Sequence, residues 1–341
     1  MDTKIRYIAN KGTPQEATHL FTLDELLLGD GRLVGLGGLI RNEMQSRFDG
    51  LLHVENGIAY NPTVSIKRVD RPGLFAGLPY GLYINNPSRS MRPKPTQGTS
   101  SSDAPKKPCA FCTNHLGKEL EIMRDTFEAY ALTPNKFHIV GYHMLLMSRE
   151  CRKQNDLLSE DLEAAMKFSY LFDMFMIYNR MEAGGTIDHF HMQAFPYELA
   201  PGHTIPLHAV LEGQRENDVL LPYCERLDVP RFSLKEYPGA TACFAGSKAP
   251  QQTLEYLAKS RSEAAKYNLV VDKDVIVVVP RNNIYAPNTG TFLAGLEMCG
   301  GIPTLNIVDK HGNVVTSADQ LQESQTYYIF QATMQHATCA R

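Results

Sequence analysis

The sequence lacks the features that mark a membrane-spanning or secreted chain. None of its apolar runs approaches the roughly 18 residues that a transmembrane helix needs. The first stretch, MDTKIRYIANKGTPQ, has no apolar core of a signal peptide. The seven cysteines are odd in number and widely spread, which argues against a disulfide framework. We therefore expect a protein of a reducing, cytoplasmic compartment that has no membrane partner.

An excess of basic charge is missing as well. The formal net charge is −3 at pH 7. General binders of nucleic acid or of anionic membranes carry a basic excess, so no nucleic-acid partner is expected. A small anionic ligand is still compatible with this charge, because backbone amides and a few side chains are enough to hold one.

The chain has 341 residues, and 43% of them are hydrophobic. This is enough for two domains, or for one domain built of two similar halves, around a substantial core. Strand–helix–strand patterns occur in both halves without a short-period repeat, which indicates the α+β class. Residues 87–108 are rich in Pro, Ser and Lys and predict a mobile surface loop.

Four segments show the clearest local patterns. Residues 137–148 are apolar and branched, with a Gly-Tyr break, and predict strand structure. Apolar residues at helical spacing predict a helix over 160–179, with Ser159 as its N-cap. A second helix is predicted over 250–268, and a buried strand over 274–281.

The most informative stretch is TIDHFHMQAF, residues 186–195. Alternate residues of a strand share a face, so His189, His191 and Gln193 are expected to point the same way. The residues between and after them are apolar or small and are expected to face the core: Phe190, Met192 and Ala194. One face of this strand is therefore expected to carry the histidine and glutamine side chains, and the other to face the core.

The face with the histidines suits phosphorus chemistry, although the spacing alone does not require it. A neutral histidine is a competent nucleophile at pH 7. The preceding Gly184 and Gly185 would let backbone N–H groups approach an anion, and Gln193 can donate a hydrogen bond to a phosphoryl oxygen. Paired histidines on a strand are equally typical of metal ligands, or of polar residues on a half-exposed face. All three interpretations stay open on this evidence.

The residues HFHMQ fit the His-φ-His-φ-Gln signature of the nucleotidyltransferase and phosphorylase branch of the histidine-triad superfamily. Residues 178–199 resemble the active-site segment of GDP-hexose phosphorylases. Residues 135–166 resemble the corresponding block of diadenosine tetraphosphate phosphorylases, and CAFC at 109–112 is similar to galactose-1-phosphate uridylyltransferase. The resemblance covers roughly residues 105–200, and it specifies the superfamily rather than the substrate.

The resemblance implies a catalytic set of His191, Gln193 and His189. His191 would attack the α-phosphorus of a donor and carry the nucleotide covalently, and Gln193 is associated with transfer rather than hydrolysis. The implied substrate-binding residues are Asn179, Gly184, Gly185, Thr186 and Lys136. Four of the five have a simpler interpretation: a helix C-cap for Asn179, a helix stop for the two glycines, and an exposed side chain for Lys136.

The Cys-x-x-Cys spacing of Cys109 and Cys112 is typical of a zinc site. By resemblance to zinc-bearing uridylyltransferases, the other ligands would be Cys151 and His189, with His115 as a rival. Such a zinc ion would be structural, and the transfer chemistry does not require it. The alternative is a pair of reduced cysteines near a loop.

By the same resemblance, the fold would be a histidine-triad-like antiparallel sheet with packed helices, in two similar halves. Residues 1–86 would be the N-terminal part, 87–108 the mobile loop, 109–214 the catalytic core and 215–341 a degenerate second half. Dimers are common in the superfamily, so a homodimer is expected by analogy.

The expected activity is cleavage of a nucleoside diphosphate sugar or a dinucleoside polyphosphate at the α-phosphorus. The nucleotide would pass through a nucleotidyl-histidine to phosphate or to a phosphorylated acceptor such as a sugar phosphate. One alternative is an inactive nucleotide-binding protein with a structural zinc. Another is a zinc hydrolase that uses His189, His191 and Asp188 as ligands.

Overall fold

The structure, a computed structural model, describes a central sheet and the elements that cover it. The described residues are 3–5 and 19–21 (backbone only), 64–70, 78–86, 109, 111–112, 129–135, 137–216, 242–259, 266–281 and 294–303. Within these residues no helix is both long and apolar enough to cross a bilayer.

Seven strands form the central sheet, and every neighbouring pair is antiparallel. Their order across the sheet is β5 (Tyr130–Pro134), β6 (Met144–Ser148), β8 (His191–Pro196), β7 (Met174–Asn179), β10 (Lys266–Asp272), β11 (Val275–Arg281) and β9 (Ala242–Ala245). Strand β8, which carries part of the histidine motif, therefore lies inside the sheet with a partner on each side.

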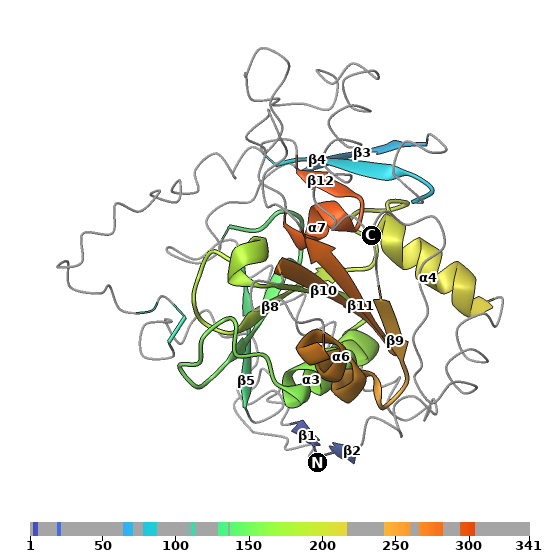
Figure 1. Ribbon diagram of the computed structural model, residues 1–341. Coiled ribbons are helices and arrows are strands. Elements are labelled where there is room, and N and C mark those ends of the chain that lie inside the picture. Colours follow the sequence, from blue (N-terminus) through green and yellow to red (C-terminus); the bar gives the residue numbers. More distant parts are fainter. Residues whose placement is uncertain are drawn as a thin grey trace.

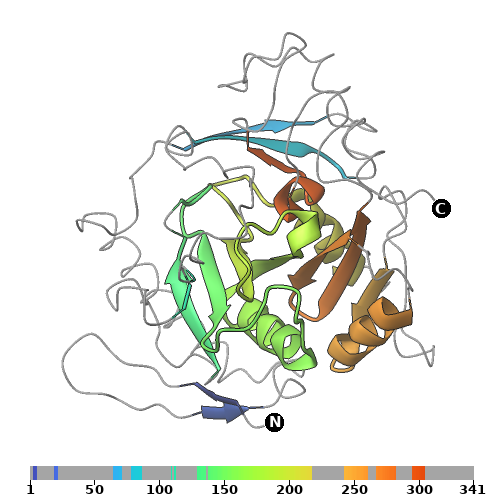
Figure 2. The ribbon, with the colours of Figure 1, turned by 60° about the vertical axis from the view of Figure 1, so that its left-hand side comes forward.

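Different elements cover the two faces of this sheet. Helices α3 (Ser159–Phe172) and α6 (Ala249–Lys259) pack on one face (Figure 1). The other face is covered by α4 (Pro206–Glu216), α7 (Gly295–Met298) and a smaller sheet. That sheet has the order β12 (Gly301–Pro303), β4 (Gly81–Asn85), β3 (Ser65–Val69), and Figure 2 shows it on the side opposite α3. Two further short strands, β1 (Thr3–Ile5) and β2 (His19–Phe21), pair with each other.

The central strands supply side chains to both apolar layers. In β10, Leu269 and Val271 join the core beneath α3 and α6, whereas Val270 joins the core on the opposite face. A strand whose side chains point alternately into two apolar layers is buried on both faces, so its sequence forms a nearly continuous apolar run. The predicted strand at 274–281 is confirmed on this basis as β11.

The helix predicted over 160–179 is too long. Helix α3 ends at Phe172, and Asp173 adopts a left-handed conformation with φ 50° and donates its N–H to the carbonyl of Ser169. The next residues form β7, which pairs with β8 and β10. The prediction failed because MFMIYN is buried on both faces, so its apolar run looks the same as a continuing helix.

The start of α3 also differs from the prediction. Ser159 is the first helical residue, and Leu158 occupies the N-cap position. The carboxylate of Asp161 accepts the Leu158 N–H at 2.7 Å, and Arg152 pairs with the same carboxylate at 2.5 Å. An acid inside the first turn therefore accepts the N–H of the N-cap residue, and no side chain at the N-cap position caps the helix.

The second predicted helix is also shorter than expected. Helix α6 ends at Lys259, and residues from Lys266 onward form β10, where a helix was predicted to 268. The reason is again a strand in the sheet interior, paired on both sides with β7 and β11. Within 137–148, the strand is confined to β6, and the residues before it form turns.

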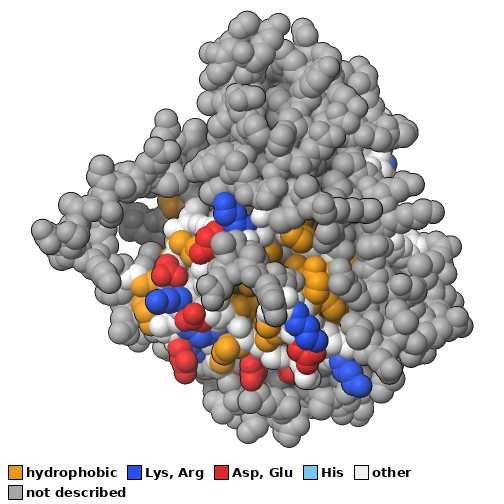
Figure 3. Space-filling model, viewed as in Figure 1, with side chains coloured by type: hydrophobic (Ala, Val, Ile, Leu, Met, Phe, Trp, Pro, Cys, Tyr) orange, Lys and Arg blue, Asp and Glu red, His pale blue; other side chains and the backbone are white. Residues whose placement is uncertain are grey.

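The α+β class and the antiparallel sheet with packed helices are confirmed. Helix α4 spans the boundary predicted at residue 214, and strands from both sides of it share the central sheet. The division into two similar halves stays a prediction, and residues 87–108 lie outside the described residues. On the face seen in Figure 3, acidic and basic side chains intermingle over the described surface.

Candidate active site and metal centre

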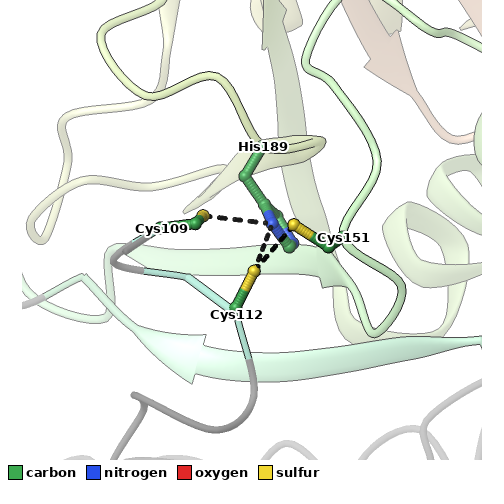
Figure 4. A group of neighbouring side chains, drawn as sticks. All are labelled: Cys109, Cys112, Cys151 and His189. Atoms are coloured by element: carbon green, nitrogen blue, oxygen red, sulfur yellow. Dashed lines mark hydrogen bonds between the residues drawn. The ribbon is translucent and has the colours of Figure 1, made fainter. Parts of the chain in front are cut away.

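Four potential metal ligands from three parts of the chain meet in front of β8. Cys109 and Cys112 come from one short segment, Cys151 follows β6, and His189 precedes β8 (Figure 4). Their ligand atoms all lie within 4.8 Å of one another. We call these four residues the cysteine cluster. The sequence predicted this set, whereas the rival ligand His115 lies outside the described residues.

Hydrogen bonding directs the imidazole of His189 toward the sulfurs. Its Nε2 lies 2.8 Å from the carbonyl oxygen of Ser148, which can only accept, so Nε2 carries the proton. The lone pair of Nδ1 is then directed at Cys109 Sγ, 3.4 Å away, and at Cys112 Sγ, 3.9 Å away. Burial lowers the pKa of His189, which favours the neutral ring that metal ions bind.

The spacing of the cluster suits a tetrahedral cation. Ligands at zinc–sulfur and zinc–nitrogen distances lie about 3.5–3.8 Å apart in a tetrahedron. The two sulfur–nitrogen distances lie close to this range, while Cys112 Sγ and Cys151 Sγ are closer, at 2.8 Å. Hydrogen bonding to Cys151, and then burial and Cys109, raise the pKa of Cys112 to about 12. The Cys112 thiol therefore stays protonated until a cation displaces its proton.

His191, the predicted nucleophile, is the first residue of β8. Its side chain is 6% exposed, and burial lowers its pKa to about 4, so the ring is neutral at pH 7. The ring Nδ1 lies 2.7 Å from the carbonyl oxygen of His189 and must donate to it. Nε2 is thereby left with its lone pair, as a nucleophile requires. Phe111 lies between Cys109 and Cys112 in the sequence. Its ring contacts the His191 imidazole in a T-shaped arrangement, with the ring centroids 5.0 Å apart.

The predicted division of this stretch into two faces is confirmed for its apolar half. Phe190, Met192 and Ala194 are all buried in the core beneath α3. Strand β8 begins at His191, so His189 lies just before it and turns its ring to the cysteines. Gln193 is half-buried on β8 between Leu145 and Ile177 of the neighbouring strands.

The predicted phosphate turn follows β7. Gly184 has φ 106°, a conformation that favours glycine, and the N–H of Gly185 donates to the carbonyl of Arg180 at 2.9 Å. A Cβ on Gly185 would lie 2.9 Å from the Asn179 carbonyl oxygen, so this position also requires glycine. Thr186 is exposed beyond the turn. The turn follows a strand and a 3-10 helix, η3 (Met181–Ala183), so the glycines do not end a long helix.

Asn179 is a buried residue at the end of β7, and not a helix C-cap. Its side-chain oxygen accepts two hydrogen bonds from much later in the chain, from Asn268 Nδ2 at 2.7 Å and from the Gly295 N–H at 2.9 Å. Asn268 Nδ2 also donates to the carbonyl of Ala183 in η3. No local pattern in the sequence connects Asn268 and Gly295 to the motif, so neither residue was predicted to belong to the site.

Lys136 and Gln154 both belong to the segment between the Cys109–Cys112 pair and the histidine motif. Lys136, a predicted phosphate ligand, lies outside the described residues. Gln154 was visible in the sequence only as a glutamine downstream of Ser-Arg-Glu, with no role attached. In the structure it is fully buried and bonds to the backbone of both His191 and Asn179.

A second group of ligand-type side chains lies between α4 and the end of β10. It comprises His208, Glu212 and Asp272, which we call the carboxylate cluster, with ligand atoms again within 4.8 Å of one another. His208 Nδ1 is 2.7 Å from the Asp272 carboxylate. Arg215 lies 2.5 Å from Glu212 and 3.4 Å from Asp272, and Lys273 lies 3.2 Å from Glu212. Cationic side chains therefore already neutralise these carboxylates.

The antiparallel sheet, the histidine motif and the glycine turn agree with the resemblance to the nucleotidyltransferase and phosphorylase branch of the histidine-triad superfamily, and comparison with known proteins supports it. Residues 114–213 match the family described as the Ap4A phosphorylase N-terminal domain. Yeast Ap4A phosphorylase Apa2 in complex with AMP is 17% identical, with a TM-score of 0.58, covering 88% of this chain and 96% of that one. The same enzyme in complex with Ap4A is 18% identical, with a TM-score of 0.58, covering 88% and 98%.

The structural similarity establishes the fold, and the family match agrees with the predicted phosphorylase-type enzyme. No match was found among curated protein sequences.

Proposed function

We propose that this protein is a dinucleoside polyphosphate phosphorylase that works through a nucleotidyl-His191 intermediate. The observation that carries the proposal is the state of His191. Its ring is buried and neutral, and the bond from Nδ1 to the His189 carbonyl leaves Nε2 available. The family match and the likeness to yeast Ap4A phosphorylase favour a dinucleoside polyphosphate over a nucleoside diphosphate sugar as the donor.

The reaction has two displacements at one phosphorus. His191 Nε2 attacks the α-phosphorus, a nitrogen–phosphorus bond forms, and the remaining polyphosphate leaves with the electron pair of the broken phosphorus–oxygen bond. An oxygen of inorganic phosphate then attacks the same phosphorus, which frees His191 and yields a nucleoside diphosphate. Gln193 donates a hydrogen bond to the phosphoryl oxygens, and the Gly184–Thr186 turn offers backbone N–H groups to the phosphates.

We also propose that the cysteine cluster holds a structural zinc ion. Three sulfurs and one imidazole whose lone pair is directed at them are a donor set that zinc prefers. Bound zinc would cross-link the Cys109–Cys112 segment to the residues before β8. This segment carries Phe111, so the cross-link would hold that ring against His191. No step at His191 requires the ion.

The rival zinc hydrolase needs His189, His191 and Asp188 to act together as ligands. Within the described residues His189 is grouped with the cysteines instead. Asp188 accepts the backbone N–H of Gln154 at 3.1 Å, and His191 Nδ1 is occupied by a carbonyl. A sugar-phosphate acceptor, a homodimer and a cytoplasmic location stay predictions from the sequence.

The test is the intact mass of the protein after brief incubation with a donor but without phosphate. The donors are diadenosine tetraphosphate, ADP-glucose, GDP-glucose, GDP-mannose and UDP-glucose. We expect an acid-labile adenylyl adduct from diadenosine tetraphosphate that disappears when phosphate is added. The adduct should be absent in His191→Ala.

His203→Ala is the matched control, because His203 Nδ1 likewise bonds to the carbonyl two residues before it, at 2.9 Å, but lies outside the site. This variant should form the adduct as the unmodified protein does. An adduct that survives His191→Ala would exclude His191 as the nucleophile. No adduct from any donor, in a folded protein, would favour the inactive nucleotide-binding alternative.

A further inference from the structure

Strands β7 and β8 separate at the residues that carry the site. They pair in register from Met174 with Pro196 as far as Ile177 with Gln193. Two residues further on, the same register would place Asn179 opposite His191, but the pairing has ended. Both strands continue through this point, because β7 still pairs with β10 and β8 still pairs with β6.

The side-chain amide of Gln154 fills this gap. Its Oε1 accepts the backbone N–H of His191 at 2.8 Å. Its Nε2 donates to the carbonyl of His191 at 3.0 Å and to the carbonyl of Asn179 at 2.9 Å. Carbonyl oxygens only accept, so the orientation of this amide is fixed by its partners. Both protons of Nε2 and the oxygen are thus bonded to the two strands.

Gln154 is itself held firmly. Its side chain is fully buried. Its backbone N–H donates to the carboxylate of Asp188, and its backbone carbonyl accepts a hydrogen bond from the hydroxyl of Tyr178 at 2.5 Å. Tyr178 is a fully buried residue of β7. These contacts hold the amide in one place, and it acts as a fixed spacer between the strands.

We propose that Gln154 is a positioning residue, which sets the backbone of the nucleophile His191 by replacing the missing β7–β8 hydrogen bonds. The inference rests on the proposed function for its catalytic consequence, whereas the spacer itself is independent of it. The side-chain amide of Gln154 lies between the backbones of His191 and Asn179 and is hydrogen-bonded to both. Loss of the amide would let the strands close or shift, and would move Nε2 of His191 away from the line of attack.

The main test uses Gln154→Met, which keeps the length of the side chain and removes its donors and acceptor. Backbone amide hydrogen exchange at His191 should become at least about tenfold faster, because its only described acceptor is lost. With diadenosine tetraphosphate and phosphate, kcat should fall about 10- to 100-fold, as expected for a nucleophile misplaced by about 1 Å. KM should stay within about threefold, because donor contacts are not removed.

Gln252→Met on α6 is the control and should change neither measurement, because this half-buried glutamine belongs to a helix that packs against α3, β9 and β11. Gln154→Glu keeps an acceptor for the His191 N–H but lacks both donors, so kcat should fall as in Gln154→Met while exchange at His191 changes less. If neither variant folds, exchange in the unmodified protein still decides, since a fast-exchanging His191 amide would contradict the spacer.

The outcomes separate the two proposals. Unchanged exchange at His191 in folded Gln154→Met overturns the spacer, whether or not the protein is active. Faster exchange with an unchanged kcat overturns the positioning role. Absence of phosphorylase activity in the unmodified protein is a failure of the proposed function, and the exchange result still tests the spacer.

Discussion

The cysteine cluster and the carboxylate cluster have similar distances but different charge. In both, the ligand atoms lie within 4.8 Å of one another. The carboxylate cluster already contains the cations Arg215 and Lys273. In the cysteine cluster, the hydrogen-bond partners of the sulfurs among the described residues are one another and His189. Short distances between ligand-type groups therefore do not define a metal site until the charges already present are counted.

The largest expected effect comes from removing one sulfur. Cys112→Ser should lower the zinc content of the purified protein from about one ion per chain to near zero. It should also lower Tm by on the order of 10 °C, because ligand binding to a structural site contributes to folding free energy. Elemental analysis and calorimetry measure both.

Cys243→Ser is the control for this prediction, because Cys243 is a buried cysteine of β9 away from the cluster. Its zinc content should stay unchanged. A protein that contains no zinc even when it is produced with zinc supplied would remove the contrast between the clusters.

The next effect is expected in the carboxylate cluster. Asp272 is fully buried, and Asp272→Asn leaves the charge of Arg215 without its nearest buried counter-charge. Breaking a buried ion pair in this way should lower the free energy of unfolding by about 3–5 kcal/mol. Denaturant titration measures the change, with the exposed Asp70→Asn as a control that should alter stability little. A simultaneous loss of zinc would show that this cluster also binds the metal.

The smallest effect is expected at the rim of the same cluster. The side chain of Glu212 is 34% exposed, and it bonds to Arg215 and Lys273. Water screens such pairs, so Glu212→Gln should cost no more than about 1 kcal/mol by the same titration. If Glu212→Gln lowered the free energy of unfolding as much as Asp272→Asn, burial would not determine how much each acid contributes. The proposed difference in charge between the two clusters would then be weakened.

The sequence predicted those parts of the site that depend on short spacing. The alternation around His191 and the Cys-x-x-Cys pair are local patterns, and the resemblance added Cys151 and His189 to the second. The sequence pattern could not predict the strands β7 and β10. Each follows a helix directly or after a short segment and is apolar on both faces, so the apolar period does not mark where the helix ends.

Other parts of the site depend on contacts between distant residues. Asn179 bonds to Asn268, 89 residues later, and to Gly295, 116 residues later. The role of Gln154 depends on a gap between two strands, which no local pattern records. Local patterns therefore indicate the histidine motif but not the residues that hold its surroundings in place.

Gly295 has a consequence for how the protein is made. A Cβ at this position would lie 2.3 Å from Cγ2 of Ile177 and 2.8 Å from Oδ1 of Asn179, so helix α7 docks against β7 without any side chain between them. During synthesis, domains fold as their residues emerge. The motif at 186–195 leaves the ribosome about a hundred residues before this partner does. The turn after β7 therefore reaches its final form only after Gly295 has been synthesised, so the nascent chain carries the histidine motif before the contacts that hold this turn in place.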